Sequence, residues 1–181
     1  GDDHRIVREG LKQAIRAIPG APYPYIITAC PDGEGAWFQA AVNNDPTIAA
    51  ACKAAYKAKF TPEFVQRVAD SVQKCQLPLT LVDIGGIPSA ENERICATAT
   101  HIIFLAGDMA RLPEWYAFAR KLGLAMVAEV HSDYHGAEDK VAGTSPDGVL
   151  RGSVHHLERG EPIADRPMIR ALAEHLVALC K

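Results

Sequence analysis

The fold of this chain is decided by the stretch LTLVDIGG at residues 79–86. Its first four residues are apolar or β-branched, which is typical of a strand that is covered on both faces. A single carboxylate, Asp83, follows, and Gly85 and Gly86 come shortly after it. This order has the form of a Walker B strand, where the carboxylate lies beside Mg²⁺ and small residues leave room for phosphates. The structural alternative is a strand that ends in an Asp turn.

Helical and extended patterns alternate on both sides of this stretch. Strands are predicted at residues 25–29, 77–82, 101–105 and 124–130. Helices are predicted at residues 5–18, 61–74, 88–97, 112–122 and 168–179, with a further helix from about residue 47 to 58. The polar region 131–165 is predicted to be a long loop with a hairpin near residues 149–156.

Apolar strands that alternate with helices predict an α/β fold: a mostly parallel sheet with helices on both faces, in one domain spanning residues 1–181. The four strands are expected to be adjacent in one layer, with none of them paired as a hairpin. In such sheets ligands bind beyond the carboxyl ends of the strands. Asp83 and Asp32 are therefore expected at the same edge, near the N-terminus of the 5–18 helix, where anions are attracted.

Two carboxylates, Asp32 and Glu34, lie in a glycine-rich turn directly after the strand at 25–29. Their i, i+2 spacing in flexible backbone lets both face one pocket as a base, a metal partner or an anchor for a hydroxyl group. A solvated acidic turn is the alternative. Both residues are candidate catalytic groups, together with Asp83, which is also the candidate metal ligand.

Two further polar groups are candidates for ligand binding. His131, Asp133 and His135 form an HxDxH run that could converge on a metal, although a polar loop at a strand end is the simpler interpretation. Arg151 lies in the polar C-terminal region, where a lid over phosphates could form, so that Arg151 joins Gly85 and Gly86 as a candidate nucleotide-binding residue. Solvated arginine is the alternative.

The chain has no Walker A motif, the phosphate loop that a Walker B strand requires. Two explanations stay open. Either the first strand and its phosphate loop lie outside the sequence given, or the loop has degenerated and the domain no longer binds a triphosphate in the usual manner. The helix at 5–18 occupies the place of the helix that follows such a loop.

Composition excludes several classes of protein. The 181 residues carry a net charge of -3, and no basic stripe suits binding to duplex DNA. No apolar run approaches the roughly 18 residues that span a bilayer. Five cysteines without a CxxC pair suggest neither a disulfide framework nor a zinc knuckle, and they favour a reduced, cytoplasmic setting.

Several of these motifs together resemble one family. They are CPDGEGxWF at 30–38, TPEFV at 61–65, VDIGG at 82–86 with PxxENE at 88–93, and TH at 100–101. The chain resembles, over about residues 5–160, the C-terminal AAA or P-loop-like domain that is fused to CRISPR-associated ring nucleases. Those enzymes destroy cyclic oligoadenylate messengers in type III antiviral defence.

The resemblance implies a P-loop NTPase-like fold, self-association into an oligomer and an accessory or regulatory role beside a ring nuclease. ATP with Mg²⁺ is the implied ligand, and the nuclease activity belongs to the other domain. A small P-loop kinase is the first alternative, with Asp32 and Glu34 near the acceptor hydroxyl and Asp83 near Mg²⁺. A degenerate scaffold without a ligand is the second.

Overall fold

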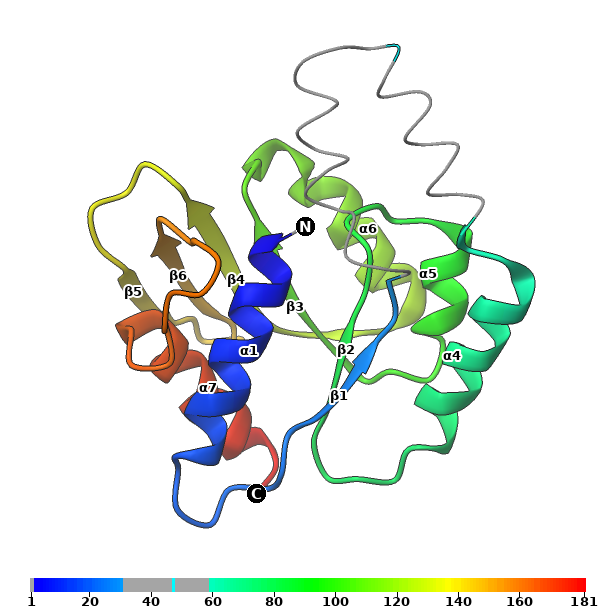
Figure 1. The fold of residues 1–181 in the computed structure, drawn as a ribbon, viewed down its shortest axis with the longest axis horizontal. Helices are drawn as coiled ribbons and strands as arrows, with labels where there is room; N and C mark the ends of the chain where they lie inside the picture. Colours follow the sequence, from blue (N-terminus) through cyan, green and yellow to red (C-terminus); the bar gives the residue numbers. More distant parts are fainter. Residues whose placement is uncertain (1, 31–46, 48–58) are drawn as a thin grey trace.

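The structure of the protein is a computed structural model, which describes residues 2–30, 47 and 59–181. Figure 1 shows the described elements, which in chain order are α1 (Asp2–Arg16), β1 (Tyr25–Thr28), α4 (Pro62–Lys74), β2 (Thr80–Asp83), α5 (Ala90–Ile95), β3 (His101–Ala106), η1 (Met109–Arg111), α6 (Leu112–Leu122), β4 (Ala125–Asp133), β5 (Lys140–Thr144), β6 (Leu150–His155) and α7 (Pro167–Leu179). The fold is α/β, as the sequence predicts. The helix predicted at 47–58 lies almost wholly outside the described residues.

The strands form two sheets. β1 and β2 are a parallel pair, and β3-β4-β6-β5 is the strand order of the second sheet. In that sheet β3, β4 and β6 are parallel, whereas β5 is antiparallel to β6. The expectation of one mostly parallel sheet is therefore corrected: the strands at 77–82 and 101–105 are not hydrogen-bonded to each other, and the second sheet is mixed. The four predicted strands do pair in parallel, β1 with β2 and β3 with β4, with no hairpin between them.

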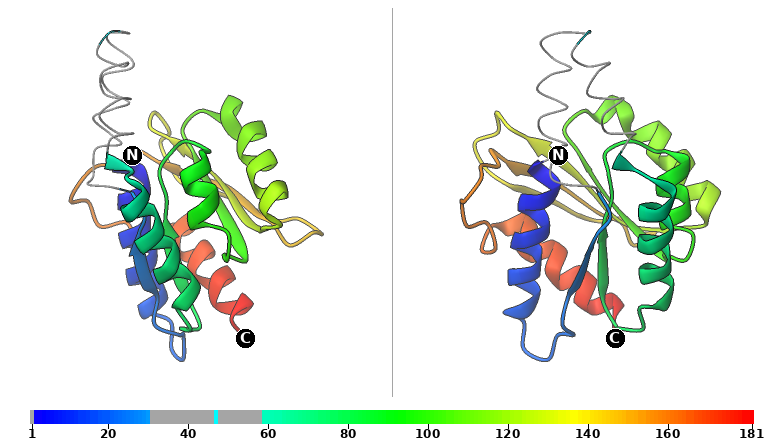
Figure 2. Two further views of the ribbon diagram at one scale, coloured as in Figure 1. Left: turned by 90° about the vertical axis from the view of Figure 1, so that its right-hand side faces the viewer. Right: turned by 45° about the vertical axis from the view of Figure 1, so that its right-hand side comes forward.

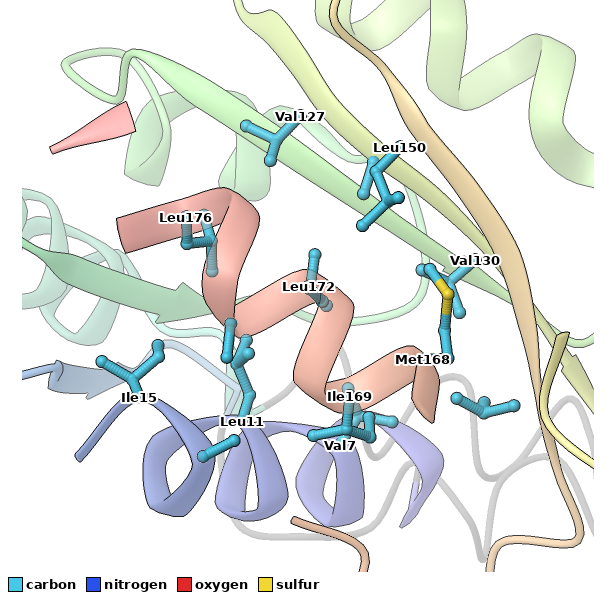
Figure 3. Packing of buried hydrophobic residues seen from close by; sticks show 14 of the residues in the cluster. Val7, Leu11, Ile15, Val127, Val130, Leu150, Met168, Ile169, Leu172 and Leu176 are labelled. Carbon is cyan, nitrogen blue, oxygen red and sulfur yellow. The ribbon is translucent and has the colours of Figure 1, made fainter. Parts of the chain in front are cut away.

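One face of both sheets is covered by α1 and α7. Both helices present an apolar stripe, which includes Leu11 and Ile15 on α1 and Ile169 and Leu172 on α7. Together with Val127, Val130 and Leu150 of the second sheet, these side chains form one cluster, in which α7 lies between α1 and that sheet, as Figure 3 shows. Leu79, directly before β2, belongs to the same cluster. This first core thus continues from one sheet to the other.

The opposite face is covered by α4, α5 and α6 (Figure 2). Its core contains Ile27 of β1, Val65 of α4, Ile95 of α5, and Phe104 of β3 beside Phe118 of α6. This second core also takes side chains from both sheets. The two sheets therefore lie in one layer between two layers of helices.

The predicted helix boundaries at residues 61 and 123 are confirmed. The Thr61 hydroxyl caps α4 by accepting a hydrogen bond from the backbone N–H of Phe64, and Pro62 occupies the first turn. α6 ends at Gly123, whose φ of 67° is the left-handed conformation that glycine adopts most easily.

The polar region after residue 130 differs from the prediction of a long loop. β4 continues to Asp133, and β5 and β6 form an antiparallel pair where a hairpin was predicted only near 149–156. The hydrophobic pattern did not reveal β5 because all five of its residues are exposed. Among the described residues, no helix is both long and apolar enough to cross a membrane.

Candidate functional site

The carboxyl ends of β1, β2 and β3 meet the first turns of α1 at one edge of the molecule, which we call the α1 rim (Figure 1). Thr28 and Asp83 end β1 and β2 and are register partners. α1 begins at this edge, so its side chains in the first two turns reach the strand ends. The part of the sequence-based prediction that places Asp83 at the carboxyl edge, near this helix N-terminus, is confirmed. The part that places Asp32 at the same edge falls outside the described residues.

Arg8 of α1 binds two strand ends at once. Its Nη1 atom donates to Asp83 Oδ2 at 3.0 Å and to Thr28 Oγ1 at 3.2 Å, and Nη2 lies 3.2 Å from Glu9 Oε1. The Arg8 and Asp83 side chains are only 15% and 16% exposed. The Nε atom of Arg8 is buried and has no hydrogen-bond partner among the described residues. A buried guanidinium thus retains one unused donor at this rim.

His4 lies one turn before Arg8 and joins the two sheets. Its Nδ1 atom lies 3.7 Å from Asp83 Oδ1, and its Nε2 atom lies 3.3 Å from the carbonyl oxygen of Leu105 in β3. Two basic side chains of one helix face therefore approach the two oxygens of a single carboxylate.

Asp3 extends the contacts of the same helix to β4. The hydroxyl of Ser132, a buried residue of β4, donates to Asp3 Oδ2 at 2.7 Å. The first turns of α1 are thereby fixed by hydrogen bonds to side chains or backbone of β1, β2, β3 and β4. The α1 rim is a preorganised set of polar groups.

The protonation of Asp83 follows from this setting. Burial of the carboxyl acts to raise its pKa, but the nearby His4 ring and the charge of Arg8 outweigh burial, so that the pKa is lowered overall. Asp83 is therefore ionised at neutral pH. A half-buried carboxylate at the end of a parallel strand is a potential ligand for a hard cation.

The two glycines after Asp83 lie in a short loop that leads to α5. Asn92 holds this loop, since its side-chain amide donates to the carbonyl oxygens of Gly85 at 3.3 Å and of Ile87 at 2.8 Å. A Cβ atom placed on Gly86 would meet nothing within 4 Å. The loop thus has a fixed base at Gly85 and open space beside Gly86.

Comparisons with known proteins add nothing to this geometry. No family model, curated protein or solved structure matches the chain.

The other candidate residues do not all join Asp83. Arg151 lies on β6 beside the α6 side of the sheet, with its Nε atom 3.9 Å from Glu129 Oε2, whereas Asp83 faces α1. The structure therefore does not bring Arg151 into one site with Asp83. Asp32 and Glu34 lie outside the described residues.

The HxDxH run is divided between strand and turn. His131 and Asp133 share a face of β4, and His135 follows in the turn. Within residues 2–30, 47 and 59–181, no three His, Cys, Asp or Glu side chains are grouped to hold a metal ion.

The α1 rim is chemically suited to Mg²⁺ at one position. Magnesium prefers hard oxygen ligands and uses few carboxylates, which the Asp83 carboxylate and Thr28 hydroxyl match. The Arg8 guanidinium, itself a cation, already lies between these two oxygens. Asp83 would therefore be the protein ligand of a bound Mg²⁺, and Arg8 would have to release it.

His4 and Arg8 were not identified from the sequence. Both fall in or beside the predicted helix at 5–18, and a helix predicted there does not show which strand end its polar face will meet. The sequence feature that could have indicated His4 and Arg8 is their i, i+4 spacing next to the apolar stripe of Val7 and Leu11.

Proposed function

We propose that this domain binds a nucleotide with Mg²⁺ at the α1 rim, with Asp83 on the metal side and Arg8 and His4 on the phosphate side. The observation that carries the proposal is the ionised, half-buried Asp83 at the end of a parallel strand, enclosed by basic side chains from the first turns of a helix. Ligands of parallel α/β sheets bind at this edge. Helix N-termini there favour phosphate groups.

The proposed exchange of partners keeps every charge compensated. A bound Mg²⁺ would replace Arg8 as the cation at Asp83, and the released guanidinium would pair with phosphate oxygens, for which its planar donors are well matched. The unused Nε donor of Arg8 supplies a further hydrogen bond for such an anion. Arg8 thus occupies the cation position beside Asp83 when the ligand is absent.

Calorimetric titration of the full-length protein with ATP and Mg²⁺ tests this site. Asp83→Asn should weaken binding at least tenfold, which is about 1.4 kcal/mol. Asp165→Asn, at an exposed position remote in sequence from the rim, is the matched control and should bind as the wild type does. Equal affinity of the wild type and Asp83→Asn would refute the role of Asp83.

We further propose that the domain is a cytoplasmic accessory domain of a CRISPR-associated ring nuclease and assembles into an oligomer. The support is the combination of motifs at residues 30–38, 61–65, 82–93 and 100–101. Cleavage of cyclic tetra-adenylate by the nuclease should change when residues 1–181 are deleted from it. Identical rates and identical oligomer size with and without these residues would remove this role.

A scaffold without a ligand is the second candidate, and the Arg8–Asp83 ion pair favours it. An aspartate that forms an ion pair with a largely buried arginine has a structural role without any ligand. A thermal-shift measurement separates the candidates, since a ligand at 100 times its dissociation constant adds about 2.7 kcal/mol to the free energy of unfolding. The scaffold predicts no shift with Mg²⁺ and ATP.

A further inference from the structure

In the described part of the chain, the layer of strands is interrupted between β2 and β3, although the helices on both faces run across the interruption. Neither strand has a described strand hydrogen-bonded to the edge that faces the other. Both hydrophobic cores nevertheless contain residues of both sheets. We call these two facing edges, and the space between them, the sheet break.

The backbone of β2 has hydrogen-bonding groups directed into the sheet break. The carbonyl oxygens of Leu79 and Asp83 accept hydrogen bonds from the backbone N–H groups of Tyr25, the first residue of β1, and Ala29, directly after β1, at 3.0 and 2.8 Å. Alternate residues of a strand direct their backbone groups to opposite sides. The N–H and C=O groups of Thr80 and Val82 therefore point away from β1, toward β3.

The facing edge of β3 has the same character. The carbonyl oxygen of Thr100 accepts a hydrogen bond from Ala125 at the start of β4, so the alternation directs the groups of Ile103 and Leu105 into the sheet break. His4 confirms this direction at one position, because its ring approaches the Leu105 carbonyl oxygen from that side. The His4 ring occupies the position that the backbone N–H of a neighbouring strand has in a complete sheet.

The partial exposure of residues in β2 and β3 indicates the same interruption. All four residues of β2 are only half-buried, although helices lie on both sides of the strand. In β3 only Phe104 is buried, whereas β4, which has a neighbour on each edge, has buried residues along most of its length. Exposure of central strands from the side is what a missing neighbour produces.

We infer that one further β-strand occupies the sheet break, parallel to β2 and β3, and that it belongs to the same polypeptide and leads directly into α1. α1 starts at the carboxyl edge of the strands and runs antiparallel to β1, which follows it (Figures 1 and 2). In a right-handed strand-helix-strand unit, the strand before such a helix ends at the edge where the helix begins. The polar contacts of His4 with both sheets hold α1 above that end.

The chemistry of this strand follows from its surroundings. Its alternate side chains would enter the first core beside Leu81 and Leu105 and the second core beside Val82 and Phe104. The strand should therefore be apolar on both faces and rich in β-branched residues, over about five or six positions. The two sheets would become one, in the order β1-β2-new strand-β3-β4-β6-β5.

Hydrogen exchange without any ligand tests the inference, independently of nucleotide binding. Residues 1–181 are compared with the same protein carrying about 20 residues encoded upstream of Gly1, enough for a strand and a short connection. The amides of Thr80, Val82, Ile103 and Leu105 should exchange rapidly in the shorter protein and at least about 100-fold more slowly in the longer one. A proline in the middle of the added strand should abolish this protection.

Three results would overturn the inference. The four amides could already be protected in residues 1–181, which would mean that the sheet break closes without a new strand. They could exchange equally fast in both proteins. The upstream residues could lack an apolar stretch, in which case protection that appears only when a second polypeptide is added would assign the sheet break to a partner instead.

Discussion

The Nη1 atom of Arg8 lies 3.0 Å from Oδ2 of Asp83, a residue 75 positions later in the chain. This ion pair joins the second turn of the first helix to the last residue of β2. Both side chains are largely buried, and Thr28 shares the same guanidinium. One of the contacts that hold α1 over the strand ends is therefore made by the carboxylate that is also the candidate metal ligand.

The first prediction concerns the stability of the Asp83→Asn variant. Loss of the carboxylate leaves the largely buried Arg8 with only the exposed Glu9 carboxylate as a charged partner, which should lower the free energy of unfolding by about 1–3 kcal/mol. The protein should still fold, since Asp83 lies at a strand end. Urea denaturation measures the change, with Asp165→Asn within about 0.5 kcal/mol of the wild type as the control. An unchanged Asp83→Asn would mean that the ion pair does not stabilise the fold.

The second prediction is a pH dependence that belongs to Asp83. Its pKa is lower in the folded protein than in the unfolded chain, so that the charged form stabilises the fold. This contribution is complete above about pH 5 and disappears as the pH falls through the unfolded-state pKa of about 3.9 to the lower folded-state pKa. The stability difference between wild type and Asp83→Asn should therefore shrink as the pH falls below about 5 and should vanish below the folded-state pKa. A difference that stays constant over this range would contradict the assignment.

The third prediction concerns Asp139, whose side chain is fully buried before β5. Its Oδ1 atom accepts from the backbone N–H of His155 at 3.1 Å, lies 2.5 Å from His155 Nδ1, and lies 3.8 Å from Nη1 of Arg166. Asp139→Ala should lower the free energy of unfolding by about 2–4 kcal/mol, because it leaves these donors without their acceptor. Asp139→Asn keeps an acceptor oxygen and should recover part of the loss.

Urea denaturation of both variants, beside Asp165→Ala as an exposed control, provides the measurement. The expected order of stability is wild type, then Asp139→Asn, then Asp139→Ala. Equal stability of Asp139→Ala and the control variant would show that the buried carboxylate does not hold the end of β6.

The elements that depend on local pattern could be predicted from the sequence. The apolar strands, the Thr61 cap and the Gly123 helix end are set by neighbouring residues, and the structure confirms them. The strand at 124–130 was predicted too short because His131 and Asp133 are polar. The hydrophobic pattern of the sequence does not show that β4 continues through these two polar, half-buried residues.

The contacts that define the α1 rim could not be predicted from the sequence, for a different reason. Arg8 meets Asp83 only after α1 has been placed over the strand ends, and a helical pattern does not specify that placement. The same holds for Asp139 and His155, which come together through the pairing of an entirely exposed strand, β5. Asp83 could be identified because a lone carboxylate after an apolar strand is itself a local pattern.

The fourth prediction is a difference in reactivity between two cysteines. A hydrogen bond with the Thr80 hydroxyl, together with one from the backbone at Leu77, lowers the pKa of Cys75, whereas burial raises the pKa of Cys96 to about 11. The thiolate is the reactive form, so a thiol reagent at pH 8 should modify Cys75 well before Cys96. Peptide mass spectrometry after timed labelling measures both. Thr80→Val should slow the labelling of Cys75, and equal rates at Cys75 and Cys96 in the wild type would contradict the assignment.

Titration of the full-length protein with ATP and Mg²⁺ tests most directly whether Asp83 is the metal-side carboxylate of a nucleotide site. We expect saturable binding by the wild type, a loss of at least tenfold in affinity for Asp83→Asn, or about 1.4 kcal/mol, and no change for Asp165→Asn. Undiminished affinity of Asp83→Asn, or no binding by the wild type, would contradict this role of Asp83.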